Sequence, residues 1–185
     1  MSVIEKKKTS GDPTVAVAFG GGGARGYAHI HIIEVLDEMG VKPVAISGAS
    51  IGSIMGAAMA SGMKGVDVRE FSLELAGNKT DVLTRFLRSR TGGIANLFSG
   101  EYSIGQLDAL SILKEFLPKD IKADFADLNI PMSISATDYY GYSEKIFNQG
   151  DLFLAMAASA SIPAVFRPVK CDGRYMVDGG IFNPV

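Results

Sequence analysis

Apolar residues are grouped along this chain in two ways, as short continuous runs and as longer stretches with helical spacing. The runs at residues 15–19, 44–46 and 130–137 are typical of buried strands. The stretches at residues 27–39 and 51–62 repeat apolar side chains every three or four positions, which predicts helices that cover a sheet. This order predicts a three-layer α/β/α fold with a mainly parallel central sheet.

The middle of the chain predicts further helices. Residues 66–76 and 81–88 have helical patterns, and a glycine-containing loop follows at residues 91–100, so we expect this segment to form a cap over the sheet. Ser103 and Gln106 have the spacing of a capping box, which places the start of the next helix there and its end near Leu117.

The last third of the chain predicts two hairpins separated by a buried helix. Residues 142–147 are expected to pair with the strand at 130–137. Asp151 precedes an almost wholly apolar helix at residues 152–160 and is a suitable N-cap. Strands at 166–171 and 174–177 flank Asp172 and Gly173, a type I′ turn signal, and the second strand ends at Asp178.

Composition narrows the class of protein. The chain has 185 residues, of which 47% are hydrophobic and 21% charged, as expected for one globular domain. A net charge of −2 argues against a nucleic-acid binder. The single cysteine, Cys171, excludes an internal disulfide and, with only two histidines present, argues against a structural zinc site. We therefore expect no metal or organic cofactor, and a reducing, cytoplasmic location.

The first twelve residues differ from the rest. Residues 1–12 are polar and carry three consecutive lysines with no apolar run behind them, which predicts a flexible lead-in to one globular domain at residues 13–185. The longest apolar stretch, residues 152–166, is interrupted by Ser159, Ser161 and Pro163, and it is shorter than the roughly 20 residues that a membrane-spanning helix needs.

The sequence Gly48-Ala49-Ser50-Ile51-Gly52 lies between the strand at 44–46 and the following helix. GxSxG at such a junction is typical of a nucleophile elbow, in which a tight turn exposes the serine and the helix directs its N–H groups toward it. Helix N-caps also use serine, so the motif alone fits an ordinary turn as well.

A glycine-rich loop at residues 20–26 follows the first strand and leads into the first helix. Such a loop presents backbone N–H groups to an anion. Gly21, Gly23 and Gly26 match the GxGxxG pattern of dinucleotide-binding proteins, but the acidic residue expected after the second strand is missing. The other candidate anion is the oxyanion of an acyl-transfer intermediate, which needs donors close to a nucleophile.

Four blocks of sequence together resemble the patatin-like acyl hydrolases. They occur in the order found in that family and are GGGARG at residues 21–26, GASIG at 48–52, SASIPAVFRP at 159–168, and Asp178-Gly179-Gly180 followed by Asn183 and Pro184. The resemblance implies a serine hydrolase acting on lipid esters, of the phospholipase A, lysophospholipase or esterase type. Relatives usually continue further past the aspartate, which leaves open whether the catalytic domain is incomplete at its C-terminus.

The resemblance implies a catalytic dyad of Ser50 and Asp178. The histidines agree with this, because both lie on the first helix: His31 shares a face with Glu34 and Glu38, and His29 is placed to pack, with a supporting role left open. An α/β hydrolase would need a histidine after the acid, and none follows Ser50.

The expected mechanism assigns a role to each motif. Asp178 accepts the Ser50 proton, and backbone N–H groups of Gly21, Gly22 and Gly23, together with Ile51, stabilise the oxyanion. We expect Gly48, Gly52, Gly179 and Gly180 to support these turns. Arg25 is expected to brace the glycine loop, with a contact to a phosphate head group as the alternative.

One segment suits contact with a membrane. Residues 83–90 place three arginines beside three apolar residues, namely Arg85, Arg88 and Arg90 beside Leu83, Phe86 and Leu87. This composition is typical of a helix at an anionic lipid surface, and it fits an ordinary solvated helix equally well. Two other functions stay open: a Rossmann-type nucleotide-binding protein, and a lipid-binding protein without turnover.

Overall fold

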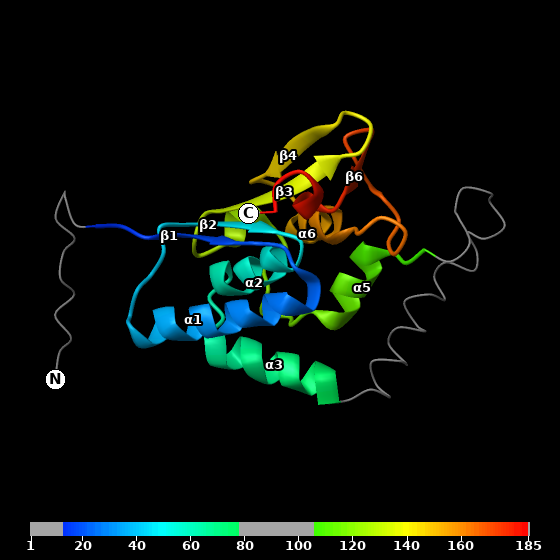
Figure 1. Ribbon diagram of the computed structural model, residues 1–185. Helices are drawn as coiled ribbons and strands as arrows, with labels where there is room; N and C mark the ends of the chain where they lie inside the picture. Colours follow the sequence, from blue (N-terminus) through cyan, green and yellow to red (C-terminus); the bar gives the residue numbers. More distant parts are fainter. Residues whose placement is uncertain (1–12, 78–105, 185) are drawn as a thin grey trace, which may run out of the picture.

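The computed structural model describes residues 13–77 and 106–184. Its centre is a mixed sheet of six strands (Figure 1). The strands are β1 (Ala16–Phe19), β2 (Ala45–Ala49), β3 (Met132–Asp138), β4 (Ser143–Phe147), β5 (Val169–Cys171) and β6 (Arg174–Val177). The α-helices are α1 (Ala28–Glu38), α2 (Ile51–Ala60), α3 (Gly65–Gly77), α5 (Ala109–Phe116) and α6 (Leu152–Ala160). Short 3₁₀ helices are η1 (Gly23–Tyr27), η3 (Phe125–Asp127) and η4 (Gly179–Ile181).

The first three strands form the parallel part of the sheet. β1 pairs with β2 in parallel, with Phe19 opposite Gly48, and β2 pairs with β3 in parallel, with Ala49 opposite Ser135. β4, β6 and β5 are antiparallel to their neighbours and extend the sheet beyond β3. The predicted α/β class with a parallel centre is confirmed.

Strand β3 has three partners, and this arrangement positions the candidate site. β4 pairs along one edge, opposite Ile134 to Asp138. The other edge is shared, because β2 pairs up to Ser135 and β6 begins its pairing at Thr137. β2 is parallel to β3 and β6 is antiparallel, so their C-terminal ends approach each other head to head at Ala136. The residues that follow these ends are Ser50 and Asp178.

The described helices cover one face of the sheet, as Figure 1 shows, and α3 lies outermost. The three-layer prediction placed helices on both faces, and the described residues supply α-helices on this face. On the other face β1 and β2 present small side chains, and Ala16, Ala18 and Ser47 are exposed. The helix-facing residues of the same strands, Phe19 and Ile46, are buried, because alternate residues of a strand point to opposite faces.

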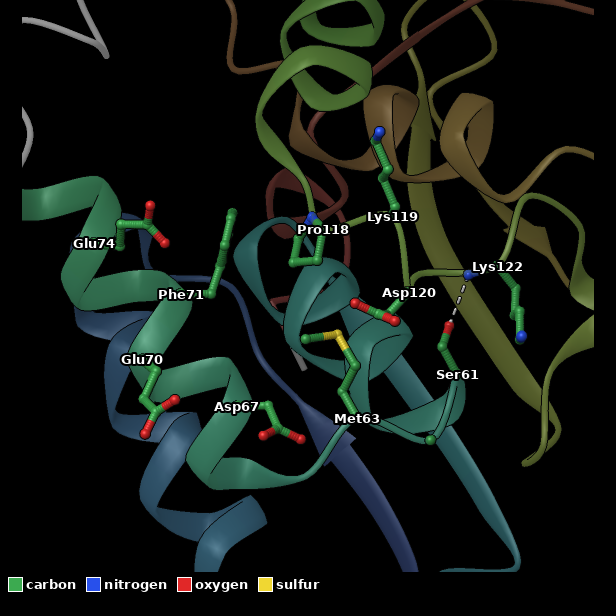
Figure 2. A pocket seen from close by; sticks show the side chains of 11 residues that line it. Ser61, Met63, Asp67, Glu70, Phe71, Glu74, Pro118, Lys119, Asp120 and Lys122 are labelled. Carbon is green, nitrogen blue, oxygen red and sulfur yellow. Dashed lines mark hydrogen bonds between the residues drawn. The ribbon is translucent and has the colours of Figure 1, made fainter.

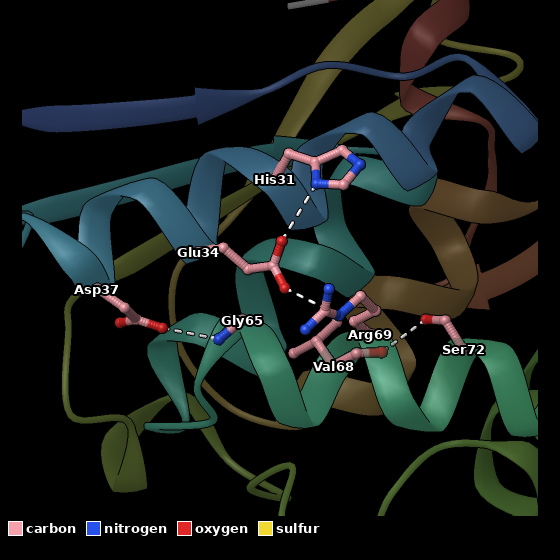
Figure 3. A network of polar contacts seen from close by, with 7 residues as sticks. All are labelled: His31, Glu34, Asp37, Gly65, Val68, Arg69 and Ser72. Atoms are coloured by element: carbon pink, nitrogen blue, oxygen red, sulfur yellow. Dashed lines mark hydrogen bonds and ion pairs between the residues drawn. The ribbon is translucent and has the colours of Figure 1, made fainter.

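Helix α3 is attached to α1 by polar contacts at its first turns (Figure 3). Glu34 on α1 pairs with Arg69 Nε at 3.0 Å and with His31 Nδ1 at 3.1 Å. The Gly65 N–H donates to Asp37 Oδ2 at 2.7 Å, which supplies a partner for one N–H at the start of α3. His31 is therefore an exposed residue paired with Glu34, as predicted.

The core lies between the sheet and the helices. Its best-buried large side chains come from both layers, and they are Phe19, Ile33, Ile134, Leu152, Met156 and Met176. Burial of apolar surface of this kind is the main favourable contribution to folding, at roughly 25 cal/mol for each Å².

Two local predictions for the last third of the chain are confirmed. Asp151 caps α6 by accepting the Leu154 N–H at 2.9 Å. Asp172 and Gly173 have φ values of 50° and 78°, which are the two positive φ angles of a type I′ turn between β5 and β6.

The predicted capping box at Ser103 and Gln106 is wrong. Gln106 lies outside any helix, and α5 begins at Ala109 with Asp108 as its N-cap, accepting the Ser111 N–H at 3.0 Å. The reason is tertiary: Leu107 pairs with the Phe166 segment, donating to the Val165 carbonyl and accepting from the Arg167 N–H, which keeps this backbone extended. The expectations for residues 1–12, 81–88, 83–90 and 91–100 lie outside the described residues.

Candidate active site

Ser50 occupies a strained turn between β2 and α2. Its φ and ψ are 51° and −126°, a conformation that is rare for a residue other than glycine and that occurs mainly at functional sites. Ser50 stands at the N-cap position of α2, yet its side chain makes no capping hydrogen bond. The simpler interpretation of the motif, a serine that caps its helix, therefore does not describe this residue.

The glycines on either side of Ser50 are required by close backbone approach. A Cβ on Gly52 would lie 2.0 Å from the Phe19 carbonyl oxygen, and one on Gly48 would lie 2.6 Å from the Gly52 carbonyl oxygen. Real Cβ atoms do not come so near to backbone oxygens, so a side chain at either position would push α2 away from β1 and β2. The two glycines thus allow α2 to pack closely on β1 and β2, and this packing fixes the position of Ser50 at the end of β2.

The side chains of Ser50 and Asp178 meet across the gap between the ends of β2 and β6. Ser50 Oγ donates a hydrogen bond of 2.6 Å to Asp178 Oδ2. Both residues are buried, with 6% and 7% of their surfaces exposed. A short bond between a hydroxyl and a carboxylate in a buried setting is the arrangement needed to remove the hydroxyl proton.

Every hydrogen-bonding group of Asp178 has a partner that fixes its position. The Gly180 N–H donates to Oδ1 at 2.8 Å, which leaves Oδ2 directed at Ser50. The Asp178 N–H donates to the Ser161 carbonyl at 3.0 Å, and Thr137 Oγ1 donates to the Asp178 carbonyl at 2.9 Å. Asp178 is thus the turn residue that starts η4 and the partner of Ser50 at the same time.

Sequence reasoning gave no role to Ser159. This residue is fully buried near the end of α6; its Oγ accepts the Ser50 N–H at 2.8 Å and donates to the Ser135 carbonyl on β3 at 2.6 Å. It therefore connects the backbone of the strained turn to the central strand. A serine within an almost wholly apolar buried helix was the available signal, since buried hydroxyls need partners.

The glycine loop lies against Ser50. A Cβ on Gly21 would be 3.5 Å from Ser50 Cβ and 3.9 Å from Gly180 Cα, so this glycine stands between the two halves of the site. Its N–H donates to the Pro184 carbonyl at 3.1 Å. Among the described residues, no backbone acceptor outside η1 pairs with the N–H of Gly22 or Gly23. These two have φ values of 147° and 56°, which favour glycine.

The other residues predicted for the site differ in their surroundings. Ile51 is the first residue of α2, so its N–H has no partner within that helix. Gly179 packs so closely on β3 that a Cβ would be 2.1 Å from the Ser135 carbonyl oxygen. Arg25 is exposed on η1 and forms no ion pair with a described carboxylate. His29 Nε2 lies 2.9 Å from the Gly20 carbonyl oxygen, where it supports the start of the loop.

The described residues hold no group of three or more His, Cys, Asp or Glu side chains arranged to bind a metal ion. Within the same residues, no helix has both the length and the apolar character to cross a bilayer.

A separate groove of about 710 Å³ lies between α3 and the segment after α5 (Figure 2). Asp67, Glu70 and Glu74 of α3 line one side. Ser61, at the far end of the ten-residue helix α2, also lines it, so the groove is roughly 15 Å from Ser50 along that helix. Its carboxylates and its distance from Ser50 make it unsuitable for a fatty-acyl ester under attack by that serine.

Comparison with known proteins identifies the family of the chain. A sequence profile described as patatin-like phospholipase matches residues 17–185, which is nearly the whole chain. The chain belongs to the patatin-like phospholipase family. The resemblance noted in the sequence is thereby confirmed, and the family is one of lipid-acyl hydrolases.

Two curated relatives and one solved structure show the extent of the similarity. The chain is 36% identical over 180 residues to an uncharacterised NTE family protein of Mycobacterium tuberculosis, covering 95% of this chain and 45% of that protein. It is 31% identical over 172 residues to human patatin-like phospholipase domain-containing protein 6, covering 92% of this chain and 12% of that protein. The chain thus spans less than half the length of these two relatives.

The crystal structure of VipD from Legionella pneumophila matches with a TM-score of 0.56 at 16% identity, covering 91% of this chain and 46% of VipD. At this identity the match supports the patatin-like fold and nothing finer.

Proposed function

We propose that this member of the patatin-like phospholipase family is a serine acyl hydrolase that cleaves fatty-acyl ester bonds of lipids, with phospholipase A, lysophospholipase or esterase activity. The observation that carries the proposal is the buried 2.6 Å hydrogen bond from Ser50 Oγ to Asp178 Oδ2, next to a glycine loop. The name of the human relative, a phospholipase domain-containing protein, points to the same substrate class.

In the first half of the reaction Ser50 Oγ attacks the carbonyl carbon of the ester, and its proton passes to Asp178 Oδ2. The carbonyl oxygen becomes an oxyanion, which accepts hydrogen bonds from the N–H groups of Gly22, Gly23 and Ile51. The intermediate collapses to an acyl-enzyme, and the leaving alcohol takes the proton from Asp178. Water then attacks the acyl carbon and gives a proton to Asp178. The bond from that carbon to Ser50 Oγ breaks, Oγ takes the proton from Asp178, and the fatty acid is released.

Gly21 has a further requirement in this mechanism. Its N–H donates to the Pro184 carbonyl, so it joins the oxyanion donors only if that hydrogen bond is exchanged for one to substrate. Without the exchange, Gly21 acts as the part of the loop that packs on Ser50. Removing one oxyanion donor costs about 3 kcal/mol of transition-state stabilisation, so each of Gly22, Gly23 and Ile51 is expected to contribute on that scale.

The test is labelling of the chain with a fluorophosphonate probe, followed by intact-mass measurement. One adduct is expected, and Ser50→Ala should abolish it, while Ser47→Ala, an exposed serine on the same strand, should leave it unchanged. Asp178→Asn should slow labelling by about 10²- to 10⁴-fold, the usual contribution of a general base. Asp172→Asn, on the turn of the same hairpin, is its matched control.

Absence of an adduct on the folded chain would contradict the hydrolase proposal. Binding of a fatty acid without labelling would then favour the lipid-binding alternative, and binding of a dinucleotide would favour the Rossmann-type alternative.

A further inference from the structure

Four of the six tyrosines of the chain lie on two adjacent hairpins. Tyr139, Tyr140 and Tyr142 follow the end of β3, and Tyr175 is on β6; the exposed fractions are 51%, 71%, 86% and 41%. Figure 1 shows the β3–β4 and β5–β6 turns next to each other at the edge of the molecule away from α3. We call these four side chains the tyrosine patch.

Three of the four tyrosine rings are in contact with one another. The ring of Tyr140 makes edge contacts with Tyr139, at a centroid distance of 5.0 Å, and with Tyr175, at 6.2 Å. Exposed aromatic groups normally occur singly on soluble proteins, and a contiguous group marks an interaction surface.

The backbone beneath the patch is held firmly. The Tyr139 N–H donates to the Tyr175 carbonyl at 2.9 Å, which joins the two hairpins. Asp138, buried beneath them, accepts the Gly141 N–H at 2.9 Å and pairs with Arg174. The rings are thus presented by a rigid scaffold, so that ordering them on a partner costs little conformational entropy.

The charges around the patch are mixed. Lys170 Nζ lies 6.0 Å from the centroid of the Tyr175 ring, and Lys145 and Arg174 lie on the neighbouring strands. Asp138 pairs with Arg174, Asp172 lies 3.9 Å from Lys145 Nζ, and Glu144, also on β4, accepts hydrogen bonds from Ser135 and Asn183. The acidic residues of α3 lie on the opposite side of the molecule (Figure 1).

Tyrosine rings beside lysine and arginine are typical of the membrane–water interface, where the ring is partly buried and the hydroxyl remains hydrated. Lys170, which forms no ion pair with a described carboxylate, favours a surface that contains anionic lipid.

The patch also lies close to the candidate dyad. β6 runs from Tyr175 to Asp178 in three residues, which is roughly 10 Å at 3.3 Å per residue. This length is comparable to the head-group layer of a bilayer, which is on the order of 5–8 Å thick. We propose that the tyrosine patch docks this chain on the interfacial layer of an anionic phospholipid bilayer; the inference rests on the proposed function, because it places a lipid hydrolase at its substrate.

The test is flotation with vesicles of phosphatidylcholine and phosphatidylglycerol at 7:3, compared with pure phosphatidylcholine. Tyr140→Ser combined with Tyr142→Ser should lower the vesicle partition coefficient by about tenfold or more. The matched control is Met39→Ser combined with Leu73→Ser, which removes two large apolar side chains of similar exposure elsewhere and should leave partitioning unchanged. Lys145→Gln combined with Lys170→Gln should remove the preference for the anionic vesicles.

Fluorophosphonate labelling, which needs no membrane, is measured on the same variants and should be unchanged, and thermal unfolding verifies that each variant is folded. Equal vesicle binding by the tyrosine variant and the wild-type chain would overturn the docking proposal, as would failure of the wild-type chain to bind vesicles. A third result is possible: the chain binds vesicles through the tyrosines but is not labelled by the fluorophosphonate probe. This result would support the docking surface and reject the hydrolase function.

Discussion

The buried hydroxyl of Ser159 accepts the backbone N–H of Ser50 at 2.8 Å and donates to the Ser135 carbonyl at 2.6 Å. The residue with a strained φ of 51° is therefore anchored to the central strand by a side chain 109 residues away. Strain at a functional residue persists only where the surrounding contacts enforce it, and Ser159 is one of those contacts.

Ser159→Ala should weaken both stability and labelling. It leaves the Ser50 N–H and the Ser135 carbonyl without their partner, which costs about 1–3 kcal/mol for a buried group. We expect fluorophosphonate labelling to slow by roughly tenfold or more as the turn relaxes. Urea unfolding and labelling kinetics measure the two effects.

Ser161→Ala is the control, because it removes a buried hydroxyl that donates to the Ala157 carbonyl within the same helix end and does not touch Ser50. Equal slowing of labelling by both variants would show that Ser159 acts through general stability alone.

Gly52→Ala should be strongly destabilising. The new Cβ would lie 2.0 Å from the Phe19 carbonyl oxygen and 2.6 Å from that of Gly20, both backbone atoms that cannot move without displacing β1. Overpacking of this kind costs about 1–3 kcal/mol and occasionally more. The midpoint of urea unfolding is the measurement.

Gly56→Ala on the same helix is the matched substitution. Its nearest neighbour would be the flexible end of Met132, at 2.8 Å, and alanine gains roughly 1 kcal/mol of helix propensity over glycine. Similar unfolding midpoints for the two variants would contradict the close packing of α2 on the glycine loop.

Cys171 should be almost unreactive in the folded chain. Burial, with a smaller contribution from Asp172, raises the pKa of the thiol to about 11. At pH 7.5 its thiolate population is roughly 300-fold below that of an ordinary cysteine near pKa 8.5. Iodoacetamide labelling should be correspondingly slow in buffer and fast in denaturing urea, and rapid modification of the native chain would show that β5 is exposed.

Asp138 should make the hairpins sensitive to acid. The Gly141 N–H, followed by the Arg174 guanidinium, lowers the pKa of Asp138 below its usual value. For a lowered pKa the stabilising contribution is fully present above the unfolded value of about 3.9 and is lost as the pH falls through the folded value. We therefore expect acid to destabilise the wild-type chain below about pH 4 more steeply than Asp138→Asn.

The measurement is the unfolding midpoint between pH 7 and pH 2. Asp172→Asn, at an 86% exposed side chain on the adjacent turn, should follow the wild-type curve. A wild-type curve no steeper than that of Asp138→Asn would rule out this role.

Much of the local structure was determined by the sequence. The apolar runs predicted β1, β2, β3 and the helices α1 and α2, since strand and helix periodicities differ and need no distant information. Asp151 and the Asp172-Gly173 turn were equally local, because a cap or a type I′ turn depends on adjacent residues. The one failed cap, at Ser103 and Gln106, is where Leu107 pairs with the distant Phe166 segment.

The sequence also named the two residues that meet: the GxSxG motif indicated Ser50, and resemblance to a family indicated its pairing with Asp178. Their contact was decided by the tertiary structure, since β2 and β6 approach each other head to head along one edge of β3. The pairing of Gly21 with Pro184, the anchoring of Ser50 by Ser159 and the exposure of the tyrosine patch depend on the same folding of distant segments. Periodicity records which face of an element is buried, whereas the identity of the partner across a sheet is set by packing of the whole chain.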